Sequence, residues 1–344
     1  MTSDIRTVDA AMLTRLQGWV GKTETLSDTV TATPVRALSA TLDREDAAPT
    51  PGTPLPELWH WLYFLPVARQ SGLGPDGHPQ RGGFLPPVPL PRRMWAGGRL
   101  MWHQQVLQVG DAITRSSRIE SVTHKAGRSG DLVFVLVRHE VRNVQGLALT
   151  EEHDIVYREN VAPTLVASRT SLHLAGRRSP EASLLSPVQS CSSSFGAAGS
   201  SPEGANFPRG GPSENSAVPA PVAAMKDAAW SREVIPDDVL LFRYSALTFN
   251  GHRIHYDRKY ATEVEGYPGL IVHGPLIATL LADLLRRNMP GARLLKFEFR
   301  AVRPVFDLWP FKLHGLPSAD GKTVSLWTED HEGWLTMQAT ATLA

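Results

Sequence analysis

The stretch His273-Gly-Pro-Leu-Ile-Ala-Thr-Leu-Leu-Ala-Asp-Leu-Leu-Arg-Arg287 carries the clearest structural pattern in the chain. Its leucines and isoleucine recur with the spacing of one helix face, which predicts a helix over residues 275–287 with a wide apolar stripe. Pro275 suits the first turn, and Arg286 and Arg287 complement the negative C-terminal end of the helix. A stripe of this width is typical of a helix wrapped on one side by a curved sheet.

The sequence on both sides of this helix predicts antiparallel strands and a second, similar unit. In the C-terminal part we expect strands at residues 239–244, 292–302, 310–317, 323–329 and 334–342. In the N-terminal part we expect a short amphipathic helix at 8–20, a buried helix at 57–65, and strands at 99–107, 112–124, 132–144 and 148–158. The pattern predicts an α+β protein with two copies of one helix-plus-antiparallel-sheet module.

Two segments interrupt this order. Residues 71–98 are dense in Gly and Pro, which predicts a long loop or the rim of an active site. Residues 175–224 are rich in Ser, Gly, Pro and Ala and predict a flexible linker. The predicted division is therefore an N-terminal module at 1–174, the linker, and a catalytic C-terminal module at 225–344.

Composition narrows the class of protein. The chain has 344 residues, 42% of them hydrophobic, and a formal net charge of +1, so global charge favours neither nucleic acid nor an anionic membrane as a partner. Its one cysteine, Cys191, cannot form an intramolecular disulfide, which favours a reducing compartment. The N-terminus lacks an apolar signal core, and no run approaches the roughly 20 apolar residues of a membrane span. We expect a soluble, cytoplasmic protein.

The turn Asn250-Gly-His-Arg-Ile-His-Tyr-Asp257 gathers side chains suited to proton transfer. His255 is a candidate general base, and the amide of Asn250 could fix a water molecule or orient that histidine. His252 and His255, with Asp257, could instead hold Zn²⁺ or Fe²⁺, although further ligands are not evident, and a purely structural role is a third alternative. We favour the proton-transfer role and predict neither a metal nor a cofactor.

Gly274 precedes the helix and has a second candidate role. A glycine at a helix start lets a ligand approach unpaired backbone N–H groups, which stabilise a developing oxyanion. The alternative is simple steric entry into the helix. His273, beside it, is a candidate substrate-binding residue, as is His252.

The motif turn, together with Glu265-Gly-Tyr-Pro-Gly-Leu-Ile-Val-His-Gly-Pro-Leu276, resembles the MaoC-like, (R)-specific acyl-thioester hydratase/dehydratase superfamily. The branch it resembles most contains mesaconyl-C4-CoA hydratase, itaconyl-CoA hydratase and mitochondrial-type 3-hydroxyacyl-thioester dehydratase. Arg92-Arg-Met-Trp-Ala-Gly-Gly98 and Lys125-Ala-Gly-Arg-Ser-Gly130 also resemble that branch. The resemblance covers roughly residues 50–160 and 230–344.

The resemblance implies a double hotdog fold, in which each module wraps an antiparallel sheet around a long helix. It also implies a hydro-lyase acting on an acyl-CoA or acyl-ACP, with (R)-type stereochemistry. In the family signature Asp-x-Asn-Pro-x-His, the histidine falls on His255, and the helix glycine falls on Gly274. The family's aspartate is replaced by Asn250, and Asn-Pro becomes His252-Arg253. We hypothesise that His255 alone transfers protons while Asn250 anchors water, with Asp257 in reserve.

The sequence leaves the substrate, the oligomeric state and the substrate-binding arginines open. The first module lacks the motif turn, so we expect it to shape the acyl tunnel and the CoA site. Our first substrate hypothesis is a short branched dicarboxylyl-CoA such as mesaconyl-C4-CoA; the alternatives are a fatty-acyl dehydratase and a non-catalytic acyl-thioester-binding protein. A thioesterase is disfavoured, because no carboxylate stands at the helix start. A homodimer is possible. Candidates for binding the carrier's phosphates or a substrate carboxylate are Arg92, Arg93, Arg300 and Arg303.

Overall fold

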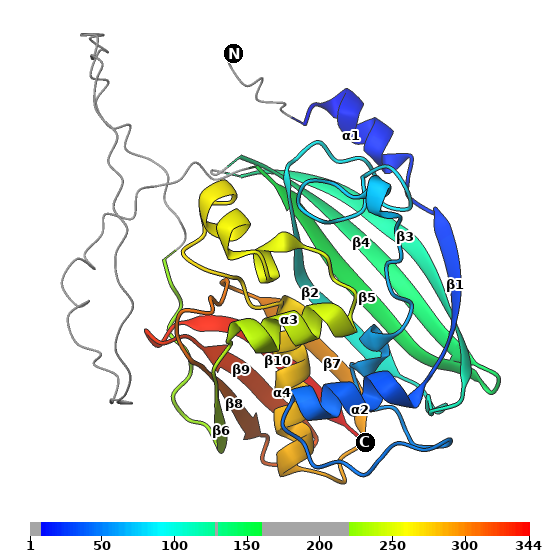
Figure 1. Ribbon diagram of the computed structural model, residues 1–344, viewed down its shortest axis with the longest axis vertical. Helices are drawn as coiled ribbons and strands as arrows, with labels where there is room; N and C mark the ends of the chain where they lie inside the picture. The colour runs from blue at the N-terminus through cyan, green and yellow to red at the C-terminus, as the bar shows by residue number, and fades with distance from the viewer. Residues whose placement is uncertain (1–7, 128–129, 160–219) are drawn as a thin grey trace, which may run out of the picture. The chain divides into compact units, whose positions relative to one another are not determined.

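The computed structural model describes residues 8–127, 130–159 and 220–344 (Figure 1), all within one compact unit. The predicted linker at 175–224 lies outside the described residues except for residues 220–224. Those last residues are tied to the sheet, because the Leu335 N–H donates to the Val222 carbonyl and the Ala224 N–H donates to the Gly333 carbonyl. The division into two modules and a linker stays a prediction.

The described strands form one antiparallel sheet of ten strands, in the order β1-β3-β4-β5-β2-β7-β10-β9-β8-β6. This confirms the α+β class and the doubled antiparallel unit. The strands are β1 (Thr23–Thr29), β2 (Arg92–Trp102), β3 (Ala112–Gly127), β4 (Gly130–Asn143), β5 (Gly146–Arg158), β6 (Trp230–Val234), β7 (Leu294–Ala301), β8 (Phe311–Pro317), β9 (Thr323–Glu329) and β10 (Leu335–Leu343). Strand β9 has the same bounds as the strand expected at 323–329, whereas the sequence pattern did not predict β1 and β6.

The two predicted modules meet where β2 pairs with β7, from Gly97 opposite Arg300 to Met101 opposite Lys296. Gly97 is needed at this junction, because a Cβ there would lie 2.5 Å from the carbonyl oxygen of Phe299. Strand β2 starts at Arg92, inside the segment predicted as a loop, so the loop is shorter than expected. The C-terminal part of the predicted loop instead forms the beginning of β2, the strand through which the two halves of the sheet are joined.

Helix α4 (Gly274–Asn288) forms where the apolar stripe predicted it, and it packs against β8, β9 and β10 (Figure 1). The residues from Leu276 to Leu285 are all buried in this helix. They belong to a core that also takes side chains from α2 (Ala32–Thr41), α3 (Asp238–Leu247) and strands of both halves of the sheet. A smaller core forms where α1 (Ala10–Gln17) covers β3.

An ion cluster fixes α4 to its surroundings. The carboxylate of Asp283, with a side chain only 1% exposed, accepts hydrogen bonds from Arg44, Arg232 and Arg287 at 2.6, 3.0 and 2.6 Å. These arginines come from the segment after α2, from β6 and from α4 itself. One buried carboxylate thus connects the N-terminal half of the chain to the central helix of the C-terminal half.

The predicted helix at 57–65 is wrong. Only Trp59–Leu62 forms a single 3-10 turn, while Leu58 and Phe64 have left-handed φ angles of 68° and 55°. The segment is buried as expected, but in the consecutive runs 58–60 and 62–64 and not as one helix face. The left-handed conformations of Leu58 and Phe64 end the turn on both sides, and Pro66 restrains the residue before it.

The predicted strand at 239–244 is also wrong, because that segment lies in α3. The Asp237 carboxylate accepts a hydrogen bond from the Leu240 N–H at 2.8 Å, which is the N-cap interaction that starts a helix. The Val-Leu-Leu-Phe run is compatible with a helix or a strand, so the N-cap interaction of Asp237 determines that this segment is helical. None of the described helices is long and apolar enough to cross a membrane.

Candidate active site

The motif turn follows directly from the end of α3. Phe249 has a left-handed φ of 48°, and the Asn250 N–H donates to the Ser245 carbonyl at 2.8 Å, so the chain reverses at once. The Oδ1 atom of Asn250 then accepts a hydrogen bond from the His252 N–H at 3.0 Å. This is the local turn that asparagine favours, and it delivers the chain into a 3-10 turn over Arg253–His255.

His255 is held in the tautomer that a general base requires. Its side chain is buried, and its Nδ1 atom lies 2.7 Å from the carbonyl oxygen of Ile271, which can only accept a hydrogen bond. The proton therefore resides on Nδ1, and Nε2 carries the free lone pair. Burial, opposed by the hydrogen bond to Ile271, lowers the pKa of His255 to about 4, so the ring is neutral near pH 7.

Four imidazoles form a continuous row around His255. Its ring stacks on that of His273 with centroids 3.8 Å apart, and it meets that of His252 edge-on at 5.4 Å. The His252 ring in turn lies 4.1 Å from that of His78. At the inner end of the row, His273 Nε2 and Ser245 Oγ are 2.8 Å apart, and His273 Nδ1 has no partner among the described residues.

The row is built to remain uncharged. Burial lowers the pKa of His273 well below its ordinary value, and the neighbouring imidazoles act in the same direction. The pKa of His252 falls to about 2, because burial dominates and His78 and His255 add to it. A proton taken up anywhere in this row is therefore strongly disfavoured unless something nearby compensates its charge.

Gly274 is the first residue of α4 and follows the innermost imidazole. Nothing lies within 4 Å of the position where a Cβ would stand, so the space beside this residue is open. Its N–H is one of the unpaired donors of the helix start, and Pro275 contributes no donor. The positive end of a 15-residue helix thus lies next to the row, with open space beside the Cα atom of Gly274.

A loop of the N-terminal half docks on the motif turn. The Arg253 N–H donates to the Asp76 carbonyl at 2.9 Å, and the Arg253 guanidinium donates to the Pro75 carbonyl at 3.0 Å. Gly77, with φ of 87°, allows the closest approach, because a Cβ there would lie 1.9 Å from the carbonyl oxygen of Gly251. The loop and the turn are therefore packed backbone to backbone.

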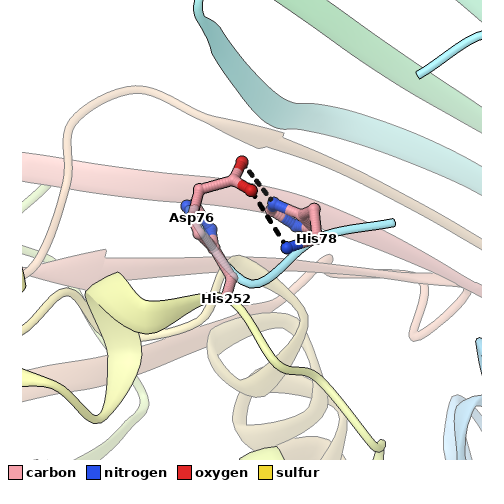
Figure 2. Close-up of side chains that lie close together, drawn as sticks. All are labelled: Asp76, His78 and His252. Carbon is pink, nitrogen blue, oxygen red and sulfur yellow. Dashed lines mark hydrogen bonds and ion pairs between the residues drawn. The ribbon is translucent and has the colours of Figure 1, made fainter. Parts of the chain in front are cut away.

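This docking brings a carboxylate to the outer end of the row (Figure 2). One carboxylate oxygen of Asp76 accepts the His78 N–H at 3.0 Å, and the other accepts His78 Nδ1–H at 3.1 Å. Oxygen and nitrogen atoms of Asp76, His78 and His252 all lie within 4.8 Å of one another, a spacing that could also hold a divalent ion. Hydrogen bonding to His78 holds the pKa of Asp76 well below its ordinary value despite partial burial.

Comparisons with known proteins identify the family of this chain. Residues 58–185 and 208–307 match the family described as hydroxyacyl-thioester dehydratase type 2. The chain belongs to this family. It is 41% identical to the mesaconyl-C(4)-CoA hydratase of Chloroflexus aurantiacus over 325 residues, which span 94% of this chain and 96% of that protein. The predicted class of activity, an acyl-thioester hydro-lyase, is thereby confirmed.

Solved structures confirm the fold of this hydroxyacyl-thioester dehydratase family member. A MaoC-like dehydratase matches with a TM-score of 0.60 and 16% identity, covering 95% of this chain and 99% of that one. HtdX from Mycobacterium tuberculosis matches with a TM-score of 0.55 and 16% identity, covering 92% and 98%. The doubled hotdog architecture implied by the motif resemblance is therefore confirmed.

The structure brings the predicted catalytic residues together: His255, Asn250, Gly274 and the two flanking histidines lie in one site. Asp257, the reserve candidate, is engaged elsewhere. It accepts two hydrogen bonds from the Arg253 guanidinium, at 3.0 and 2.8 Å, and one from the Tyr260 N–H at 3.0 Å.

The predicted substrate-binding arginines occupy different environments. Arg92 donates to the Tyr267 hydroxyl and the Glu265 carbonyl at 3.0 and 2.8 Å. Arg93 lies close enough for its charge to lower the pKa of both His78 and His252. Arg300 is exposed on β7, and strand alternation places it on the face opposite Phe299, which is part of the main core. Arg303 is 3.5 Å from Asp330.

Sequence reasoning missed Asp76 and His78. They stand in Pro75-Asp-Gly-His78, a turn sequence within the Gly- and Pro-rich loop. The signal that could have found them is a histidine two residues after an aspartate in a loop long enough to suggest a function. The sequence does not show that residues 75–78 contact the motif turn, because 170 or more residues separate the two segments along the chain.

Proposed function

We propose that this protein reversibly hydrates a short branched dicarboxylyl-CoA, with mesaconyl-C4-CoA as the first substrate to test. The observation that carries the proposal is His255, a buried neutral imidazole whose Nδ1–H is fixed by Ile271, beside a helix start with open space at Gly274. The near full-length match to a mesaconyl-C(4)-CoA hydratase supports the substrate.

The chemistry needs one base and one oxyanion site. His255 Nε2 takes a proton from water as the water oxygen bonds to the β-carbon of the unsaturated thioester. The electrons of the double bond move toward the thioester oxygen, where the Gly274 N–H and the helix dipole stabilise the enolate. His255 then returns the proton to the α-carbon, so water is added across the bond and the imidazole is neutral again.

Asn250 and Arg93 complete the proposed arrangement. Because the Oδ1 atom of Asn250 is bound to the His252 N–H, its Nδ2 donors remain to fix the attacking water. Arg93 is the predicted arginine whose charge reaches the imidazole row, so it is the best candidate for the distal carboxylate of the substrate or a phosphate of its carrier. His252 and His273 line the reacting centre on its two sides.

The test is turnover of two substrates by the purified protein. Mesaconyl-C4-CoA and crotonyl-CoA are supplied separately, loss of the enoyl-thioester absorbance is followed, and the product is identified by mass. We expect hydration of the dicarboxylyl substrate. Faster turnover of crotonyl-CoA would instead place the protein with fatty-acyl dehydratases, the alternative that the family description favours. Binding of both esters without turnover would support a non-catalytic acyl-thioester-binding protein.

His255→Ala is the matching variant, expected to reduce kcat by the roughly 10²- to 10⁴-fold typical of a lost general base. His331→Ala is its control, because His331 is exposed and stacks on Trp309 outside the site. Equal activity of the two variants would remove His255 from the mechanism.

A cytoplasmic location and a homodimer remain predictions.

A further inference from the structure

The motif turn offers the base no carboxylate that is not already engaged elsewhere. Asn250 occupies the place where the family signature has an aspartate, and Asp257 is bound to Arg253 and the Tyr260 N–H. A base that takes a proton becomes an imidazolium, and here it would do so while buried and stacked on neutral imidazoles. Arg93 makes this harder still, because its positive charge also acts on the row. Some negative charge should therefore compensate the proton.

Asp76 is placed to supply that charge. Its carboxylate binds His78 through both oxygens and lies within 4.8 Å of a ring nitrogen of His252. From there the row continues edge-on to His255. Asp76 and His252 influence each other electrostatically: the carboxylate favours the protonated ring, and the ring favours the ionised carboxylate.

The position of Asp76 is enforced by the fold rather than by chance packing of an exposed side chain. The Asp76 carbonyl accepts the Arg253 N–H, the Pro75 carbonyl accepts the Arg253 guanidinium, and Gly77 allows the backbone contact with Gly251. Three residues that fix the loop, Pro75, Asp76 and Gly77, thus belong to the same short segment that carries the carboxylate. The segment comes from the N-terminal half, whose predicted role is to shape the acyl tunnel and the CoA site.

We propose that Asp76, acting through His78 and His252, is the counter-charge that stabilises the proton held transiently on His255. It takes the electrostatic place of the aspartate that the motif turn has lost. Asp76 is a positioning residue in this role, since it contacts imidazoles and not the reacting atoms. The proposal rests on the hydration mechanism above, in which the proton moves from water to His255 and then to the α-carbon.

The test variant is Asp76→Asn in the full chain, because asparagine keeps an oxygen acceptor for the His78 N–H and removes the charge. Asp76 lies within 4.8 Å of a His252 nitrogen, and the His252 and His255 ring centroids are 5.4 Å apart. A unit charge about 10 Å away at an effective dielectric constant of about 20 corresponds to roughly 15-fold in rate. The Asp76 side chain is 30% exposed, so screening reduces the expected fall in kcat to about 3- to 10-fold. KM should change less than kcat, since the substrate does not touch this residue.

The pH profile separates this role from a structural one. Without the carboxylate the row binds a proton less readily, so the acidic limb of kcat/KM should move to lower pH while kcat falls. Asp76→Glu, which restores the charge, should recover part of the activity. Asp131→Asn is the matched control: Asp131 binds His124 at 2.8 Å in another partly buried Asp–His pair, and its loss should leave kcat and the acidic limb unchanged.

Four results would overturn the proposal. The first is an unchanged kcat in Asp76→Asn. The second is a loss of activity in Asp76→Asn without a shift of the acidic limb and without recovery in Asp76→Glu. Either result would mean that the carboxylate has only a structural role. Loss of activity on treatment with a chelator, restored by Zn²⁺, would make the Asp76, His78 and His252 cluster a metal site instead. If the unchanged protein hydrates neither enoyl-CoA, the proposed function itself fails, and the counter-charge role is rejected with it.

Discussion

Gly77→Ala tests whether the loop of the N-terminal half must lie against the motif turn for catalysis. The new Cβ would stand 1.9 Å from the carbonyl oxygen of Gly251, and real Cβ atoms essentially never come within 3.0 Å of such an atom. The loop or the turn must therefore move by at least about 1 Å. A displacement of that size between reacting groups can reduce the rate by about 10²-fold, which is the fall in kcat that we expect.

The control for this variant is Gly82→Ala in the same loop. Gly82 has a similar left-handed φ of 97°, but its Cβ would meet only Pro87 at 3.8 Å, an ordinary contact. Both variants carry the backbone strain of alanine at positive φ, about 1 kcal/mol, so their difference isolates the contact with the turn.

The assay is enoyl-thioester hydration at saturating substrate, with the midpoint of thermal unfolding measured for each variant. We expect a much lower kcat for Gly77→Ala alone, and the unfolding midpoints establish that both variants are folded at the assay temperature. Equal kcat values in the two variants would refute the reasoning, because the loop could then leave the turn without affecting the site.

Three further predictions concern the helix start, the ion cluster and pH. Gly274→Ala should leave stability unchanged or raise it by up to about 1 kcal/mol, since space is open for its Cβ. Alanine keeps the backbone N–H, but its methyl group occupies the space through which the thioester oxygen would approach that N–H, so kcat should fall toward the roughly 10²-fold loss of an oxyanion contact; thermal unfolding and turnover measure the two effects. Asp283→Asn should lower the free energy of unfolding by about 3–5 kcal/mol in denaturant titrations, because Arg44 and its fellow arginines lose their buried partner. Burial lowers the pKa of His255 and of His139 to about 4, below the ordinary 6.5, so between these values the unfolded chain binds protons that the folded chain does not. The free energy of unfolding should therefore be constant above pH 6.5 and decline as the pH falls from 6.5 to 4. Thermal unfolding midpoints that stay the same across that window would contradict these pKa values.

The sequence by itself determined the elements whose pattern is local. The apolar stripe of α4, the alternation in β3, β4 and β9, and the His255 and Gly274 positions all follow from residues close together in the chain. Local patterns failed where a cap or a proline competed with them. Asp237 turned a predicted strand into α3, and left-handed conformations at Leu58 and Phe64, followed by Pro66, limited a predicted helix to one 3-10 turn.

The tertiary structure alone decided which groups surround the base. The tautomer of His255 depends on the carbonyl of Ile271, which belongs to another segment, and the carboxylate at the end of the imidazole row comes from Asp76 in the other half of the chain. The physical reason is that charge compensation acts through space at a few ångströms, whereas the patterns read from a sequence report only neighbours on one helix face or strand. Asn250 showed that a carboxylate was missing from the motif, and only the packing of Gly77 against Gly251 showed where another one stands.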